Sequence, residues 1–123
     1  MLLGLYIFVD DDFDDPIYAA PDSDELDEEA WEAGCEAIVA ALEGDGHNAG
    51  VKTVGELRIG WKSMPRAGIS FLVIVPKKTK ATSVVSYLRH LSRTYMEEVD
   101  DPRYPGRHGV EEVVIEVIPP WEA

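Results

Sequence analysis

The pattern of hydrophobic and polar positions divides the chain into blocks of different period. Residues 2–9 are almost entirely apolar, which predicts a strand that is covered on both sides. An Asp-rich segment with two prolines follows at residues 10–22, and we expect it to be a long, mobile loop. A helix is then predicted between a cap at Asp22 or Ser23 and a stop at Gly44. Its apolar side chains recur every three or four positions and define one buried face: Trp31, Cys35, Ile38 and Leu42.

The middle of the chain has the period of strands. From Val51 the period changes to two, which predicts one half-buried strand. In it Leu57, Ile59 and Trp61 alternate with Glu56, Arg58 and Lys62. Residues 62–68 form a hairpin-like connection, and residues 69–75 are a second strand that is almost fully apolar.

A helix and a strand are predicted for the remainder. Residues 110–118 largely alternate between β-branched and acidic side chains, which favours a last strand, and we expect the tail 119–123 to be mobile. The helix follows the basic segment 76–80 and has a buried stripe at helical spacing: Val84, Leu88, Leu91, Tyr95 and Val99.

The order of these elements predicts the fold class. Strand, helix, strand, strand, helix, strand is the order of a ferredoxin-like βαββαβ sandwich, an α+β fold. Its antiparallel four-stranded sheet has the order 4-1-3-2, with two helices on one face. A chain of 123 residues fits one such domain, residues 1–123.

This fold leaves one face of the sheet without helices. The two apolar strands would then expose a large patch there, and soluble monomers rarely leave such patches open. We therefore predict an oligomer of identical or different chains through this face, with the tail as a possible contributor. The residues expected on the face are Tyr6, Phe8, Leu72 and Ile74.

Charge is distributed unevenly along the chain. Fifteen carboxylates precede the first Lys or Arg, which is Lys52, and the whole chain has a net charge of −13. Such a field disfavours nucleic acid and anionic membranes and favours a basic protein partner. The predicted footprint of that partner lies on the first helix: Asp24, Glu25, Glu28, Glu29, Glu32 and Glu36.

The favoured function is therefore a small protein–protein binding or regulatory module. One form is an inhibitor or adaptor, like an immunity protein, that docks a basic surface such as that of a nuclease-like toxin. A structural subunit of a larger assembly is a further alternative, suggested by the open sheet face.

A second class of function uses the Asp-rich loop. The predicted topology places this loop beside Arg103, Arg107 and His108, so a small enzyme or a ligand or cation sensor is an alternative. Clustered carboxylates are oxygen ligands for divalent cations, although their spacing here matches no EF-hand loop. The weak candidates for such a site are Asp10, Asp11, Asp12, Asp14 and Asp15.

The remaining chemistry-bearing residues give weaker signals. Lys77, Lys78 and Lys80 precede the second helix, where they and free N–H groups form a weak candidate anion site. Cys35, the only cysteine, is read as a small core residue, so no disulfide is possible within the chain. No nucleophilic triad is evident, so an enzyme is the less favoured reading, and no cofactor is predicted. A cytoplasmic location is expected, without a secretory signal or a membrane span.

Overall fold

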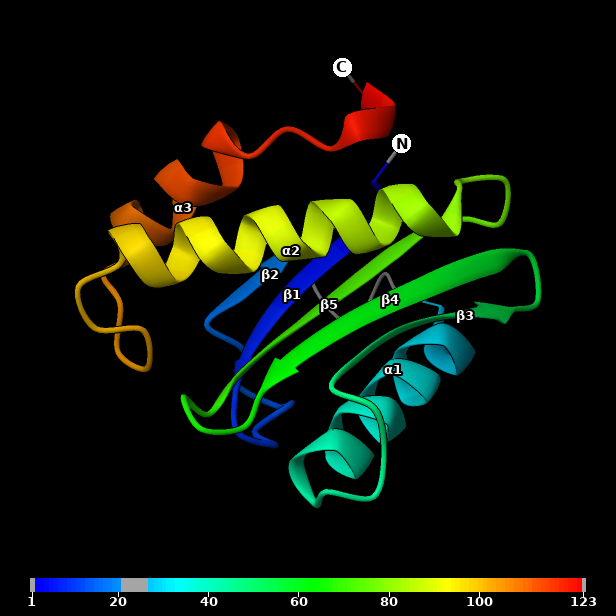
Figure 1. Ribbon diagram of the computed structural model, residues 1–123, viewed down its shortest axis with the longest axis horizontal. Coiled ribbons are helices and arrows are strands. Elements are labelled where there is room, and N and C mark those ends of the chain that lie inside the picture. Colours follow the sequence, from blue (N-terminus) through cyan, green and yellow to red (C-terminus); the bar gives the residue numbers. More distant parts are fainter. Residues whose placement is uncertain (1, 21–26, 123) are drawn as a thin grey trace.

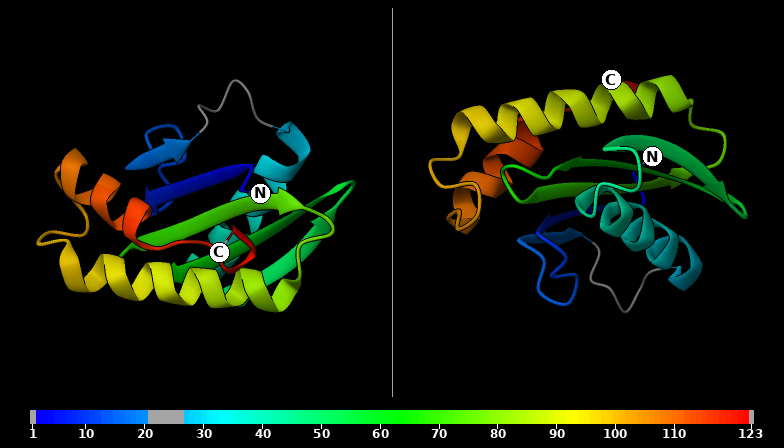
Figure 2. Two further views of the ribbon diagram at one scale, coloured as in Figure 1. Left: turned by 90° about the horizontal axis from the view of Figure 1, so that it is seen from above. Right: turned by 60° about the horizontal axis from the view of Figure 1, so that its bottom comes forward.

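The computed structural model describes residues 2–20 and 27–122. The described elements form three layers, in which α1 lies on one face of a sheet and α2 and α3 lie on the other (Figures 1 and 2). The sheet order is β2-β1-β5-β4-β3, and each pair of neighbouring strands is antiparallel. In chain order, the elements are β1 (Gly4–Val9), β2 (Tyr18–Ala20), α1 (Glu28–Leu42), β3 (Ala49–Val54), β4 (Leu57–Met64), β5 (Ile69–Pro76), α2 (Ala81–Glu98), α3 (Arg107–Glu116) and the 3₁₀ helix η2 (Pro120–Glu122).

The chain is α+β, as its pattern predicts, but the ferredoxin-like arrangement is wrong. The sheet has five strands in the order 2-1-5-4-3, rather than four in the order 4-1-3-2. The described α-helices number three rather than two, and they cover both faces of the sheet. The adjacent, antiparallel pairing of the two most apolar strands is common to both arrangements, because β1 lies beside β5.

Two differences from the predicted pattern account for the additional strands. Gly55 has a positive φ of 59° and forms a tight turn across which Val54 pairs with Leu57, so residues 51–62 are not one strand. Apolar and charged residues alternate clearly only after this turn, and the short segment before it does not by itself show that a separate strand is present. The other addition is β2, a three-residue strand inside the predicted loop, which pairs with β1.

Helix α3 replaces the strand predicted at residues 110–118. Val110, Val113 and Val117 are buried at spacings of three and four, and they belong to the core on the α2 side of the sheet. Ile115, which strand alternation would bury, has 77% of its surface exposed. Valine favours strands locally, but the burial of these three side chains outweighs that preference.

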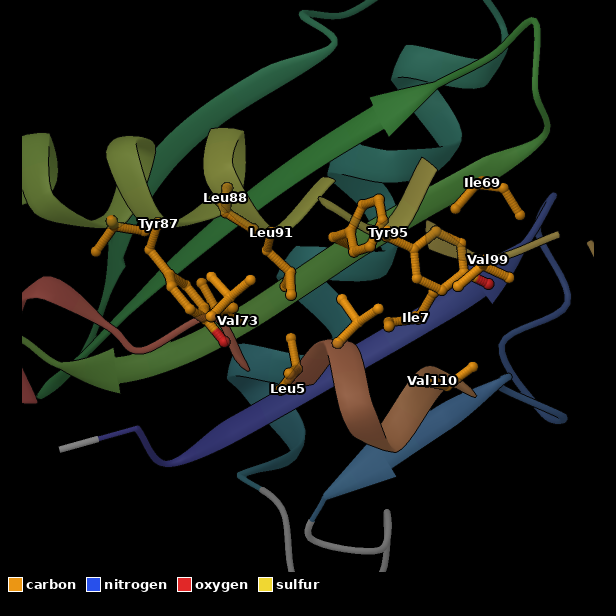
Figure 3. Packing of buried hydrophobic residues seen from close by; sticks show 14 of the residues in the cluster. Leu5, Ile7, Ile69, Val73, Tyr87, Leu88, Leu91, Tyr95, Val99 and Val110 are labelled. Atoms are coloured by element: carbon orange, nitrogen blue, oxygen red, sulfur yellow. The ribbon is translucent and has the colours of Figure 1, made fainter. Parts of the chain in front are cut away.

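The core between the sheet and α2 holds more of the described buried hydrophobic residues than the core on the other face. Leu5, Ile7 and Val73 point from the sheet toward Leu91 and Tyr95 of α2 (Figure 3). The predicted stripe of this helix is confirmed, since all of its members are buried in this core.

The core on the other face corrects the prediction of an open sheet surface. Tyr6, Phe8, Leu72 and Ile74 are at most 2% exposed, because α1 covers them. The ring of Trp31 in α1 meets those of Tyr6 and Phe8 edge to face, at centroid distances of 5.0 and 5.5 Å. The open face on which the oligomer prediction rested therefore does not exist.

Helix α1 contacts the sheet through small residues. Its buried positions are Ala30, Gly34, Ile38 and Ala41. Ile38 is buried as predicted, whereas the other three each precede a predicted member of the stripe by one position. A Cβ atom on Gly34 would lie within 2.5 Å of a methyl group of Leu72, so the absence of a side chain permits this close approach. Trp31, Cys35 and Leu42 consequently lie at the sides of the contact and are half-buried.

The end of the chain packs on the α2 side. Trp121 meets Tyr87 edge to face at 5.5 Å, and Pro119 is buried. The tail therefore lies opposite the face that it was expected to cover. No helix in the described parts of the chain is long and apolar enough to cross a membrane.

Candidate functional site

The most distinctive surface of the molecule is an acidic stripe along α1. Glu29, Glu32, Glu36 and Glu43 follow one another at spacings of three, four and seven, and all are exposed. Glu28 is also exposed in the first turn, while Asp24 and Glu25 lie outside the described residues. Within residues 2–20 and 27–122, none of these glutamates has an ion-pair partner.

The sequence around residue 27 explains where this helix begins. The Oδ1 atom of Asp27 accepts a hydrogen bond from the backbone N–H of Ala30 at 2.9 Å, which makes Asp27 the N-cap. The predicted caps, Asp22 and Ser23, lie outside the described residues. Glu28 and Glu29 occupy the first turn, where carboxylates suit the helix dipole.

The Asp-rich loop lies beside this stripe and extends it. Phe13, the one apolar residue among Asp10–Asp15, packs its ring edge to face on Phe8 at 5.0 Å. Phe8 also contacts Trp31, so the aromatic cluster brings the loop next to α1. Sequence reasoning placed the loop and the helix separately, and Phe13 is the signal that could have joined them.

The pKa of Cys35 reflects the negative charges of both the Asp-rich loop and α1. The pKa of its thiol is raised from 9.0 to about 12, chiefly because burial disfavours the thiolate. The nearby carboxylates of Asp14, Glu32 and Glu36 raise the pKa further. Asp14 of the loop and the helix glutamates therefore act on the same point, and we call this combined surface the acidic face.

One member of the Asp-rich loop is neutralised. Nη2 of Arg103 lies 2.8 Å from Oδ2 of Asp10, and this contact ties the start of the loop to the segment between α2 and α3. The adjacent cations behave differently, because Arg107 pairs with Glu111 and Arg66 has no ion-pair partner in the described parts of the chain.

A cleft of about 700 Å³ brings together several residues of the alternative site. Asp12 and Asp15 from the loop line it, together with Arg103 and Arg107. Both arginines already bind carboxylates of this chain, which limits their attraction for an external anion. His108 does not line the cleft, and its Nε2 atom lies 2.9 Å from Oε1 of Glu112.

The structure adds little support for the predicted cation site and the predicted anion site. Across residues 2–20 and 27–122, no three His, Cys, Asp or Glu side chains converge in a way that could hold a metal ion. Lys77, Lys78 and Lys80 are exposed before α2, and Lys80 is its N-cap without a capping side chain. Arg58 joins them there by donating from Nη1 to the carbonyl of Thr79.

Neither known protein families nor curated proteins supply a function for this chain by similarity. No protein-family model matches the chain, and no curated protein is significantly similar to it.

Proposed function

We propose that this protein is a binding module that docks a basic surface of a protein partner on its acidic face. The observation that carries the proposal is the row of α1 glutamates beside Asp14, without cationic partners among the described residues. Opposite charges arranged in this way steer a partner toward the surface and accelerate its association.

Beyond the first turn, the placement of these charges is unfavourable for the stability of α1. Glutamates three or four positions apart repel one another and destabilise a helix. Glu43 lies at the C-terminal end of α1, where a negative charge opposes the helix dipole. A basic partner would relieve both effects, which supports binding as the role of the acidic face.

A matched pair of variants tests the proposal. The first replaces Glu29, Glu32 and Glu36 with glutamine, and the control replaces Glu97, Glu98 and Glu112, three exposed glutamates of α2 and α3. The immobilised full chain and both variants are used to capture proteins from the source lysate at low and moderate salt. Captured proteins are identified and their affinities are then measured with purified components.

The expected result is a basic partner that the control retains and the α1 variant loses. Its affinity should fall steeply with added salt, because exposed charges are screened over about 10 Å at 0.1 M salt. Equal losses in the two variants, or an affinity that does not depend on salt, would contradict the proposal.

The cleft beside α3 supports a second candidate function, the binding of a small ligand. Its opposing charges, Asp12 and Asp15 against Arg103 and Arg107, suit a ligand with groups of both signs. The test is a thermal-shift screen of small zwitterionic compounds against the native chain and the Arg107→Gln variant. A shift that this variant abolishes supports the cleft, and the absence of any shift counts against it.

A further inference from the structure

A groove lies where α1 ends, between this helix and the β4–β5 hairpin. It consists of two adjoining hollows of about 670 and 260 Å³, and both are lined by Leu42, Glu43 and Pro65. Asp11 borders the smaller hollow and Asn48 borders the larger one. We call this feature the α1-end groove, and it continues the acidic face at one end.

The walls of the larger hollow are mainly apolar, whereas the rim of the groove is mostly negative. Leu42, Met64 and Ala67 supply half-buried apolar surface. Glu43 and Asp11 are exposed at the rim, and neither has an ion-pair partner within residues 2–20 and 27–122. Among the described residues that line the two hollows, Arg66 is the one cation.

The backbone adds to this negative potential. Helix α1 ends at the groove without a basic residue in its last turn, so no cationic side chain of the helix itself offsets the negative end of its dipole. The last carbonyl groups, of Val39, Ala40 and Ala41, accept hydrogen bonds from the backbone N–H groups of residues 43–46. An apolar channel that leads to a carboxylate and a helix C-terminus complements a long side chain with an aliphatic stem and a cationic head.

We infer that the α1-end groove receives an arginine side chain of the basic partner. The inference rests on the proposed function and names the anchor within the acidic face. The methylene groups of the arginine would lie against Leu42 and Met64, and its planar guanidinium group would donate to the carboxylate of Glu43. Arginine is favoured over lysine because its guanidinium binds carboxylates with two parallel hydrogen bonds and is less strongly hydrated.

The test uses a small probe in place of the unidentified partner. N-acetylarginine amide is titrated into the isotopically labelled full chain, and backbone amide shifts are followed by NMR. N-acetylcitrulline amide, a neutral compound of nearly the same shape, and N-acetyllysine amide serve as comparison probes. The variants are Glu43→Gln, which removes the charge at the rim, and Asn48→Trp, which fills the groove without changing charge. Glu97→Gln is the matched control on α2.

The arginine probe should shift amides around Glu43, Asn48 and Ala67, and the citrulline probe should not. Glu43→Gln should weaken this binding about tenfold, the usual consequence of losing one charge-assisted contact. Asn48→Trp should abolish the shifts, and Glu97→Gln should leave them unchanged. Shifts spread evenly over the acidic face, equal binding of the lysine probe, or insensitivity to Asn48→Trp would overturn the inference.

The result can be separated from a failure of the proposed function. If the partner still binds the Asn48→Trp variant with full affinity, the groove is not its anchor although the acidic face remains its docking surface. If the Glu29, Glu32 and Glu36 variant retains the partner, the proposed function fails whatever the small probe does in the groove.

Discussion

Arg103 and Asp10 are 93 residues apart in the chain, and their side chains form an ion pair that lies against the Cα atom of Gly68. The three residues belong to three different loops at one end of the sheet. Asp10 also donates its backbone N–H to the carbonyl of Gly68 at 2.8 Å. Asp10 therefore connects the Asp-rich loop to both the hairpin and the α2–α3 segment, and Gly68 lies against this contact.

Replacement of Gly68 by alanine should destabilise the protein by about 1–2 kcal/mol. Gly68 has a positive φ of 70°, a conformation that costs an L-residue about that much. A Cβ atom would also collide with Nη1 of Arg103 and press on Asp10, so the ion pair would have to move. Urea unfolding measures the change. Gly106→Ala is the control, because nothing lies within 4 Å of the added atom, and an equal loss there would refute this explanation.

Replacement of Gly34 by alanine should destabilise the α1 layer. The added Cβ would overlap the buried side chain of Leu72, and overpacking of this kind costs about 1–3 kcal/mol. Alanine favours a helix over glycine by about 1 kcal/mol, which offsets part of the loss. Gly109→Ala in α3, where the added atom has open space, should instead stabilise the protein. Thermal unfolding of both variants checks the difference in sign.

Replacement of Glu36 by lysine should stabilise the isolated protein while it weakens partner binding. The change removes repulsion with Glu32 and creates a Glu–Lys pair at the favourable spacing of four, with a gain of about 0.2–0.5 kcal/mol. Chemical unfolding and partner affinity are measured on the same preparation. A variant that loses stability would show that Glu36 contributes to the fold, which would count against its assignment to a docking surface.

The thiol of Cys35 should react slowly at alkaline pH. Its pKa of about 12 leaves little thiolate at pH 9, whereas half of an ordinary thiol with a pKa of 9.0 is ionised there. Alkylation of the native protein at pH 9 should therefore be at least about a hundredfold slower than alkylation in urea. Asp14→Asn should accelerate the native reaction by lowering the pKa, while Asp45→Asn, at the far end of α1, should not.

The same shift predicts how stability depends on pH. The folded-state pKa of Cys35 lies above the unfolded one, so the unfolded chain binds fewer protons between pH 9 and 12. The contribution of this residue is thus intact below pH 9 and is lost as the pH rises toward 12. The free energy of unfolding in urea is measured at pH 8 and 10 for the native chain and for Cys35→Ser. The native chain should lose more stability between these pH values than the variant, and the difference is the contribution of the Cys35 thiol.

The strongly periodic elements were predictable and the connections were not. The apolar runs at β1 and β5 and the stripe of α2 are long enough to fix their own structure. Strand β2 has only three residues, and its formation depends on pairing with β1. The valines of α3 satisfy both a strand and a helix pattern, and packing against the core decided between them.

The candidate site was only partly visible in the sequence. The exposed glutamates of α1 follow from helical periodicity, and the described members of the predicted set do lie on its solvent side. The proximity of Asp14 to Cys35 depends on the aromatic packing of Phe13, which is a tertiary contact. The α1-end groove depends on the β4–β5 hairpin, whose position no local pattern specifies.

The position of β5 in the middle of the sheet has a consequence for how the protein folds. Strand β1 pairs along its length with β5, with Leu5 opposite Val73, although several elements separate the two in the chain. During synthesis, the edge of β1 that pairs with β5 therefore stays unpaired until residues 69–76 have been made. Such distant pairing slows folding and leaves an apolar edge exposed to other chains. We expect the join between β1 and β5 to be the slow step of folding and the origin of any aggregation at high concentration.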